Sequence, residues 1–355
     1  MPIRVVVAED SLTVRKRLVE VLSDDPELQV VAEAADGKAA IEAVERLRPD
    51  VVTLDMMMPV MTGVAAAEYI MAYCPTPILV VSASTNRGEL FRTYDALAAG
   101  AIDVLDKPTG DGPTQAWEER LRATVKLVSR IKVITHLRAR LGATNRPKPA
   151  PATPGLASDP QRRATLVAIG GSTGSPGAVA QILRALPGNF PSPILLVVHI
   201  NEPFGAAFAE WLDAQSPLRV RYARDGERLS GLRSPSVLMA PPGRHLVVER
   251  DMLRLDDGPE RHSCKPAVDV LFSSLAHEAG ADALACLLTG MGRDGALGLL
   301  DVRRAGGATI AQDEATSIVF GMPREAILLG AAERVLPLGE IAPALVAGVA
   351  ARRPT

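Results

Sequence analysis

The first third of the chain alternates short apolar runs with longer segments whose apolar residues recur every three or four positions. Runs at residues 3–7, 51–54 and 78–81 predict buried strands, and the periodic segments between such runs predict amphipathic helices. Regular alternation of strands and helices is typical of a parallel sheet with helices on both faces. We therefore predict an α/β domain of five strand–helix units in this part of the chain.

Polar side chains follow four of the predicted strands in this domain. Glu9 and Asp10 follow the first, Asp55 follows residues 51–54, and Ser82 and Lys107 follow two later strands. The carboxyl ends of parallel strands meet at one edge of a sheet, where ligands bind, so we expect these side chains to cluster. Three carboxylates together favour a hard cation such as Mg²⁺. The alternative interpretation is a set of solvated loop charges.

The hydrophobic pattern changes after residue 121. A helical stripe continues through Leu121 and Val125 to about residue 141, and residues 142–163 then contain five prolines and no apolar periodicity. A proline-rich segment of this kind is typical of a semi-extended tether. We predict a first domain at residues 1–125, an extended helix and linker at 126–163, and a second domain at 164–355.

The second domain begins with an apolar run that leads into a turn with glycine on both sides of Ser172. The residues after Pro176 have helical periodicity, so Ser172 is expected on a tight turn between a buried strand and a helix. Two functions fit such a turn. It is either a nucleophile elbow that presents the Ser172 hydroxyl or a phosphate-binding loop at a helix N-terminus.

Later strands distinguish these two interpretations. His199 follows an apolar run at residues 194–198, and Asp294 lies on a glycine-rich turn after the run at 283–288. Acyl transfer by serine requires an imidazole base and a carboxylate that orients it, whereas a phosphate loop has no use for either. We therefore favour a serine hydrolase on a doubly wound, mostly parallel α/β sheet. His245, at the start of a strand predicted at 246–248, is the rival base.

Composition excludes several other classes of function. Hydrophobic residues make up 47% of the 355 and charged residues 23%, the net charge is −2 and aromatic residues are 3%, so neither a basic field nor a stacking surface favours nucleic acid. No apolar run approaches the length of about 18 residues that crosses a membrane. The three cysteines are scattered, which favours a reducing cytoplasm over a disulfide framework. Cys264, beside Lys265, is either a reactive thiol or a bystander, and we favour the bystander; Cys286 lies in an apolar run and is interpreted as a core residue.

Residues 1–125 resemble the receiver domains of two-component response regulators. The resemblance lies in Glu9-Asp10, in residues 55–63, in Ser82, and in Asp106-Lys107-Pro108. It implies a (βα)5 receiver fold, with Asp55 as the phosphoacceptor and Ser82 and Lys107 as switch residues. The implied Mg²⁺ ligands are Glu9, Asp10, Asp55 and the carbonyl of Met57.

One departure from the receiver pattern concerns signalling. Val104 stands where receivers usually carry an aromatic switch residue. The strength with which phosphorylation of Asp55 activates the second domain is therefore left open.

Most of residues 165–350 resembles the catalytic domain of the chemotaxis protein-glutamate methylesterases, the CheB family. The resemblance lies in the motifs at residues 169–174, 197–199, 239–245, 266–269, 288–295 and 321–323. It implies a catalytic triad of Ser172, His199 and Asp294, with Thr173 and Met291 at the oxyanion and substrate pocket. One departure is Ser175, which stands where glycine is usual.

The same resemblance implies the reaction and its partners. The substrate is a γ-glutamyl methyl ester on the cytoplasmic helices of methyl-accepting chemotaxis receptors, and deamidation of receptor glutamine is a related activity. A chemotaxis histidine kinase is the implied phosphodonor, and the esterase needs no cofactor. Two alternatives remain: a response regulator whose second domain only binds a partner, and an esterase that acts on another substrate.

Overall fold

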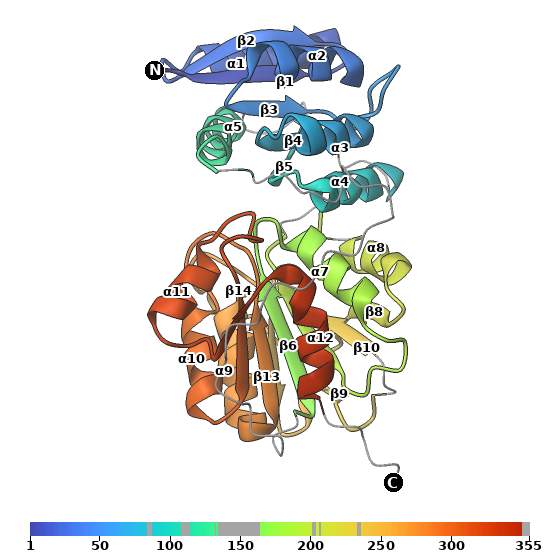
Figure 1. Cartoon of the computed structure of the whole chain (residues 1–355), viewed down its shortest axis with the longest axis vertical. Helices are drawn as coiled ribbons and strands as arrows, with labels where there is room; N and C mark the ends of the chain where they lie inside the picture. Colours follow the sequence, from blue (N-terminus) through green and yellow to red (C-terminus); the bar gives the residue numbers. More distant parts are fainter. Residues whose placement is uncertain are drawn as a thin grey trace. The chain divides into compact units, whose positions relative to one another are not determined.

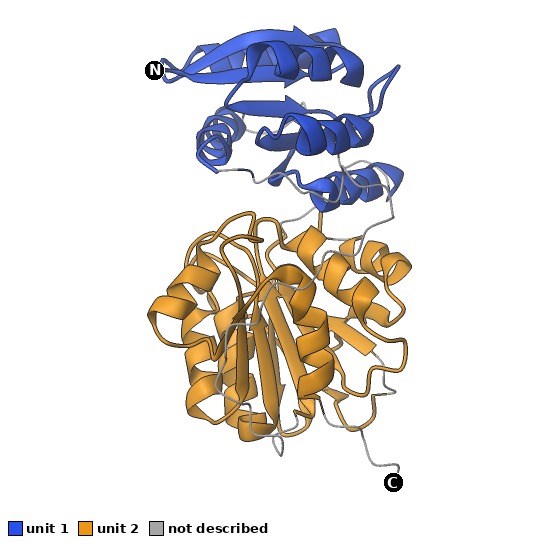
Figure 2. Ribbon diagram, viewed as in Figure 1, with its two compact units in different colours: residues 1–146 blue, residues 147–355 orange. Residues whose placement is uncertain are grey.

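The computed structural model describes residues 1–83, 87–107, 114–131, 133, 164–200, 204–205, 207–232 and 236–349. The chain divides into two compact units, Met1–Arg146 and Pro147–Thr355 (Figure 2). Most of the linker predicted at 126–163, including the end of its helical stripe, lies outside the described residues. The domain boundaries given above therefore remain predictions.

The first unit contains a five-stranded parallel sheet with the order β2-β1-β3-β4-β5 (Figure 1). Helices α1 and α5 pack together, and α3 packs against both α2 and α4. Right-handed crossovers place the first pair on one face of the sheet and the other three helices on the opposite face. The elements are β1 (Ile3–Ala8), α1 (Leu12–Ser23), β2 (Leu28–Ala34), α2 (Gly37–Leu47), β3 (Val51–Leu54), α3 (Gly63–Tyr73), β4 (Ile78–Ser82), α4 (Arg87–Ala99), β5 (Asp103–Asp106) and α5 (Thr114–Val128).

Local sequence explains where the helices of this unit begin. Ser11, Asp36 and Thr62 precede α1, α2 and α3, and each side chain accepts a hydrogen bond from a backbone N–H in the first turn of its helix. Strands β3 and β4 are completely buried, as their apolar runs predict, whereas β2 and β5 are buried only in part. Strand order reverses between β1 and β3, so the loops after these two strands form a crevice at the edge of the sheet.

The second unit contains a seven-stranded parallel sheet with the order β15-β14-β13-β6-β7-β10-β8. The α/β fold predicted for both parts of the chain is therefore confirmed. The elements are β6 (Leu166–Gly171), α7 (Ser175–Ala185), β7 (Ile194–Val198), α8 (Phe208–Gln215), β8 (Arg219–Tyr222), β9 (Glu227–Arg228), β10 (Ser236–Met239), β11 (His245–Glu249), β12 (Met252–Asp256), α9 (Val268–Ala279), η1 (Gly280–Asp282), β13 (Ala283–Leu287), α10 (Ala296–Arg304), β14 (Ala308–Gln312), α11 (Met322–Leu328), β15 (Arg334–Leu336) and α12 (Leu338–Gly348).

A small antiparallel sheet, β11-β12-β9, lies apart from the main sheet. The strand predicted at 246–248 is β11, but it belongs to this small sheet and not to the parallel one. Two residues with positive φ, Arg250 and Asp251, turn the chain directly from β11 into β12. This tight hairpin pairs β11 with its neighbour in sequence, which is an antiparallel arrangement.

The main sheet is wound in two directions from its centre. After β6 the chain forms β7 and then the edge strand β8, and β10 later takes the place between these two; the chain then returns to the other side of β6 to form β13, β14 and β15. Helices α7 and α12 pack together, as do α9 and α10, and the two pairs cover opposite faces of the sheet (Figure 1). The carboxyl ends of β6 and β13 therefore form a switch point, which is where such sheets bind ligands.

Candidate active site

Ser172 lies at this switch point, directly after β6. Its N–H donates to the carbonyl of Thr289 on the neighbouring loop at 3.0 Å, and its carbonyl accepts from the N–H and hydroxyl of Ser175 at 2.9 and 2.5 Å. Gly174 then enters α7 with a φ of +79°, a conformation that favours glycine. A Cβ on Gly290 would lie only 2.8 Å from the Cβ of Ser172. Glycine at both positions therefore permits a sharp turn pressed against the loop after β13.

His199 and Asp294 meet at the ends of the two strands that flank β6. His199 follows β7, and its backbone N–H donates to the carbonyl of Gly171 at 3.1 Å. Its Nε2 lies 2.9 Å from Oδ2 of Asp294. The Asp294 carboxylate is almost completely buried and also accepts backbone N–H groups from Val268, Asp269 and Gly295. The structure thus brings His199 and Asp294 together, as their positions after parallel strands predict.

The surroundings of these two side chains shift both of their pKa values. Burial alone would lower the pKa of His199, but the hydrogen bond with Asp294 and the contact with Cys264 outweigh burial and raise it to about 9. Burial alone would raise the pKa of Asp294, but hydrogen bonds from His199 and from two backbone N–H groups lower it. The pair therefore stabilises a positive imidazolium, which is the form that accepting a proton would create.

The second ring nitrogen of His199 faces Cys264 in this structure. Nδ1 lies 3.6 Å from Sγ of Cys264, and among the described residues no hydrogen bond joins the Ser172 hydroxyl to His199. From the sequence, Cys264 is interpreted as a bystander in preference to a reactive thiol, and nothing in the sequence pattern relates it to His199. Its contact with the imidazole is a finding of the structure alone.

His245, the rival base, has both ring nitrogens engaged elsewhere. Nε2 lies 3.0 Å from the carbonyl of Pro259, and Nδ1 accepts the N–H of Ala267 at 3.1 Å. The ring is also 2% exposed. These bonds hold the loop before α9 in place and leave no ring nitrogen for a substrate.

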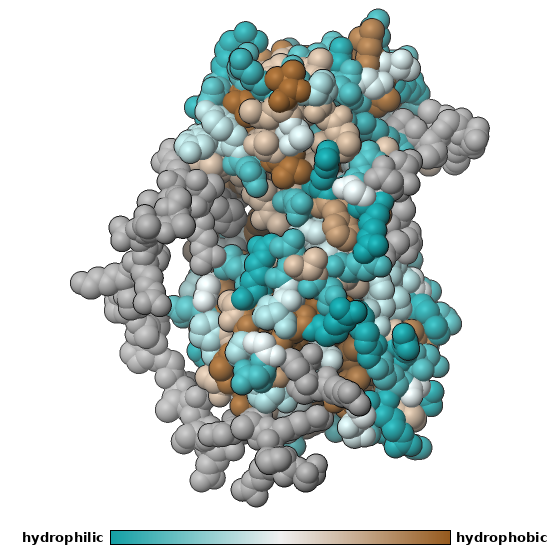
Figure 3. Space-filling view, turned by 90° about the vertical axis from the view of Figure 1, so that its right-hand side faces the viewer, coloured by the Kyte–Doolittle hydropathy of each residue, from teal (hydrophilic) through white to brown (hydrophobic). Residues whose placement is uncertain are grey.

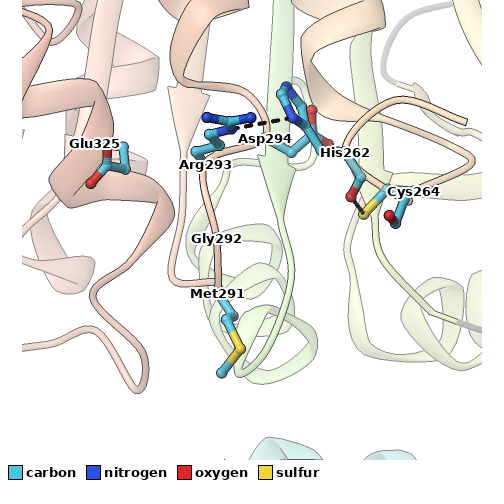
Figure 4. A pocket seen from close by; sticks show the side chains of 8 residues that line it. His262, Cys264, Met291, Gly292, Arg293, Asp294 and Glu325 are labelled. Carbon is cyan, nitrogen blue, oxygen red and sulfur yellow. Dashed lines mark hydrogen bonds between the residues drawn. The ribbon is translucent and has the colours of Figure 1, made fainter.

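A pocket of about 530 Å³ opens beside Asp294 (Figure 4). Met291 and Cys264 line it, and Arg293 reaches across to His262, with its Nε 3.4 Å from Nδ1 of the ring. No described residue accepts a hydrogen bond from the backbone N–H of Thr173 or Met291. Two such N–H groups near Ser172 suit an oxyanion, although their assignment to that role remains a prediction.

The polar residues predicted to cluster in the first unit lie at the crevice between β1 and β3. Lys107 Nζ lies 2.9 Å from a Glu9 carboxylate oxygen and 3.1 Å from Oδ1 of Asp55. Burial and the nearby Asp55 raise the pKa of Glu9 to about 7. Burial alone would lower the pKa of Lys107, but the carboxylates of Asp55 and Glu9 outweigh burial and raise this pKa.

The same crevice has the features of a cation and phosphoryl site. Carboxylate oxygens of Glu9, Asp10 and Asp55 lie within 4.8 Å of one another. Oδ2 of Asp55 and the Ser82 hydroxyl are buried with no hydrogen-bond partner among the described residues, which leaves both atoms for a bound ligand. Such a set of oxygens fits a divalent metal. Met57 follows Asp55 by two residues, and its carbonyl remains a predicted ligand.

No helix among the described residues is long and apolar enough to cross a membrane. On the face shown in Figure 3, hydrophobic residues occur in small separate patches among hydrophilic ones.

The fold and these two sites define a response regulator whose second unit is a hydrolase built on a parallel α/β sheet. A receiver-domain model, "Response regulator receiver domain", matches residues 5–115, and a second model, "CheB methylesterase", matches residues 167–345. The chain belongs to the CheB methylesterase family.

Relatives are similar to the chain over nearly its whole length. Protein-glutamate methylesterase/protein-glutamine glutaminase 2 of Anaeromyxobacter dehalogenans is 46% identical over 97% of this chain and 96% of its own. The corresponding protein of Nitrosospira multiformis is 43% identical over 99% of each chain. Among solved structures, the CheB methylesterase catalytic domain of Thermotoga maritima is 37% identical, with a TM-score of 0.49 over 52% of this chain and 97% of that one.

Proposed function

We propose that the second unit hydrolyses methyl esters of glutamyl side chains on methyl-accepting chemotaxis receptors, and that it also deamidates receptor glutamine. The observation that carries this proposal is the meeting of three adjacent parallel strands, β7, β6 and β13, whose ends deliver His199, Ser172 and Asp294. Support for the substrate comes from the names of the relatives, which are methylesterases and glutaminases acting on protein side chains.

In the proposed reaction, the hydroxyl oxygen of Ser172 attacks the ester carbonyl and His199 takes the hydroxyl proton. The imidazolium then protonates the departing methoxide, which leaves as methanol. A water molecule next attacks the acyl-serine, His199 takes a proton from that water and returns it to Ser172, and the glutamate side chain is released. Asp294 keeps the ring oriented, and the N–H groups of Thr173 and Met291 are proposed to bind the oxyanion.

The first unit is proposed to control this reaction through phosphorylation of Asp55. Glu9, Asp10, Asp55 and the Met57 carbonyl would hold Mg²⁺, which supplies charge neutralisation at the phosphoryl group. Lys107 and Ser82 would contact the phosphoryl oxygens. The phosphodonor is proposed to be a chemotaxis histidine kinase, and the location cytoplasmic, where the receptor helices and the kinase lie. The proposed linker at 126–163 joins this receiver to the catalytic domain.

The test is mass spectrometry of methylated receptor peptides incubated with wild-type protein and with Ser172→Ala. Wild type is expected to remove methyl groups with release of methanol. The variant should lose turnover by a factor on the order of 10⁶, because it lacks the atom that forms the covalent bond. Demethylation by Ser172→Ala at the wild-type rate would refute the proposal, and near-identical thermal unfolding of both proteins is the control for folding.

A further inference from the structure

Cys264 and His199 present a thiol sulfur and an imidazole nitrogen to one point at the catalytic centre. The Sγ–Nδ1 separation is 3.6 Å. Tetrahedral zinc with Zn–S of about 2.3 Å and Zn–N of about 2.0 Å separates its sulfur and nitrogen ligands by about 3.5 Å. The two atoms therefore already stand at the distance that one zinc ion requires.

The rest of the cluster prepares the imidazole for this role. Asp294 only accepts hydrogen bonds, so its contact at 2.9 Å places the ring proton of neutral His199 on Nε2 and leaves the Nδ1 lone pair toward Cys264. Histidines that bind metals usually donate their other N–H to a carboxylate in this way, which fixes the ring and strengthens the ligand. Cys264 is fixed in turn, with Sγ 3.4 Å from the carbonyl of His262.

The site is also open to an ion. Cys264 is the one partly exposed cysteine of the three in the chain, since Cys74 and Cys286 are buried and free. It lines the pocket of about 530 Å³ beside Asp294, which offers an entry path and room for water ligands (Figure 4). His199, Cys264 and Asp294 each offer a ligand atom, and these atoms lie within 4.8 Å of one another.

We propose that Cys264 and His199 form an inhibitory binding site for Zn²⁺ or a similar thiophilic divalent cation. Zinc displaces the thiol proton of Cys264 to solvent and, where His199 is an imidazolium, the Nδ1 proton as well; it then bonds to the thiolate and to Nδ1 and completes its coordination with water. Asp294 stays in the outer shell on Nε2. Because the metal occupies the nitrogen that takes the serine proton, the bound form has no base and does not hydrolyse esters.

Binding is tested with Co²⁺ as a spectroscopic substitute, a measurement that does not depend on catalysis. The full-length protein is expected to give a thiolate-to-cobalt charge-transfer band that excess Zn²⁺ removes. Cys264→Ser should lose the band, and Ser263→Ala, a matched change in the same loop that keeps the thiol, should retain it. Absence of the band from wild type, or its persistence in Cys264→Ser, overturns the proposed site.

Inhibition is tested by titrating Zn²⁺ into the ester hydrolysis assay, with each rate divided by that of the same variant in chelator. This inhibition test rests on the proposed function of the second unit. Cys264→Ser should raise the half-inhibitory Zn²⁺ concentration by at least about tenfold, since losing even an outer-shell partner weakens metal binding 10- to 100-fold. Equal sensitivity in wild type and Cys264→Ser overturns the inhibitory role. A protein that shows the cobalt band but no esterase activity contradicts the proposed function instead.

Discussion

The pKa of His199 leads to a prediction about the pH dependence of hydrolysis. The ring must be unprotonated to take the serine proton, and its pKa is raised to about 9 by Asp294 and Cys264 against the effect of burial. Below that pH most of the enzyme carries imidazolium. We therefore expect kcat/KM to increase with pH up to about 9 and to level off above it, as measured by initial rates of methanol release corrected for spontaneous hydrolysis.

The control for this assignment is Asp294→Asn. Loss of the carboxylate should lower the apparent pKa of the base, and it should reduce turnover by about 10⁴, as expected when the orienting carboxylate of a serine triad is lost. An unchanged pH profile in this variant would show that another group titrates. Loss of activity in His245→Ala with retention in Asp294→Asn would require a different base.

For individual residues, the sequence pattern identifies candidates for the catalytic site but does not show which side chains contact one another. Ser172, His199 and Asp294 each follow an apolar strand, and that pattern is visible in one sequence. The engagement of His245 by Pro259 and Ala267 is not visible, because these partners lie on loops without periodicity. The position of Cys264 against His199 escapes prediction for the same reason.

At the level of the elements, the loop after β13 packs closely against the Ser172 turn. A Cβ at Gly290 would meet Sδ of Met322 at 2.2 Å and the Cβ and backbone N of Ser172 at 2.8 and 3.0 Å. Gly290→Ala should therefore move the Ser172 turn, with a large loss of activity and a stability loss of about 1–3 kcal/mol, as for overpacked sites. Activity assays and chemical denaturation measure the two effects.

The matched control for that substitution is Gly339→Ala in α12. A Cβ at Gly339 meets nothing within 4 Å, and alanine favours helix, so this change should be neutral or stabilise by up to about 1 kcal/mol. Equal effects of the two alanine substitutions would mean that close approach at Gly290 has no role in forming the turn.

The central strands of the parallel sheets, such as β3, β4, β6, β7 and β13, are predictable from apolar runs, since burial on both faces makes each of them a continuous run. The small sheet formed by β9, β11 and β12 is less so. Its pairing depends on the turn at Arg250 and Asp251, whose positive φ values have no signature such as glycine. The parallel pairing of β6 with β13 is also not predictable from the sequence pattern, and it is known only from the assembled sheet.

For the whole molecule, Asp55→Asn tests whether the first unit controls the second. The variant loses the atom that forms the acyl phosphate, so an acyl-phosphate donor with Mg²⁺ should raise the esterase rate of wild type but not of Asp55→Asn. Asp24→Asn, an exposed aspartate of the same unit, is the control for loss of one negative charge. Normal stimulation of Asp55→Asn would place the phosphorylation site elsewhere.

The sign of regulation is tested by a chain that begins near residue 158 and lacks the receiver. A tether keeps the receiver at high effective concentration near the catalytic unit, so inhibition in the unphosphorylated state needs only a weak contact. We expect the shortened chain to hydrolyse esters at a higher rate than the unphosphorylated full-length protein, and we expect that rate not to change when the phosphodonor is added. Initial rates on one methylated receptor compare the forms, and a slower shortened chain would instead indicate a receiver that activates by contact.

The winding of the second sheet also determines when the enzyme becomes active during its synthesis. β6 and β7 leave the ribosome before β13, which follows only after β8 to β12 and α9. A nascent chain that has paired β6 with β7 thus holds Ser172 and His199 without the carboxylate that orients the ring. Because pairing between strands distant in sequence is slow, we expect a growing chain that ends before β13 to have no esterase activity.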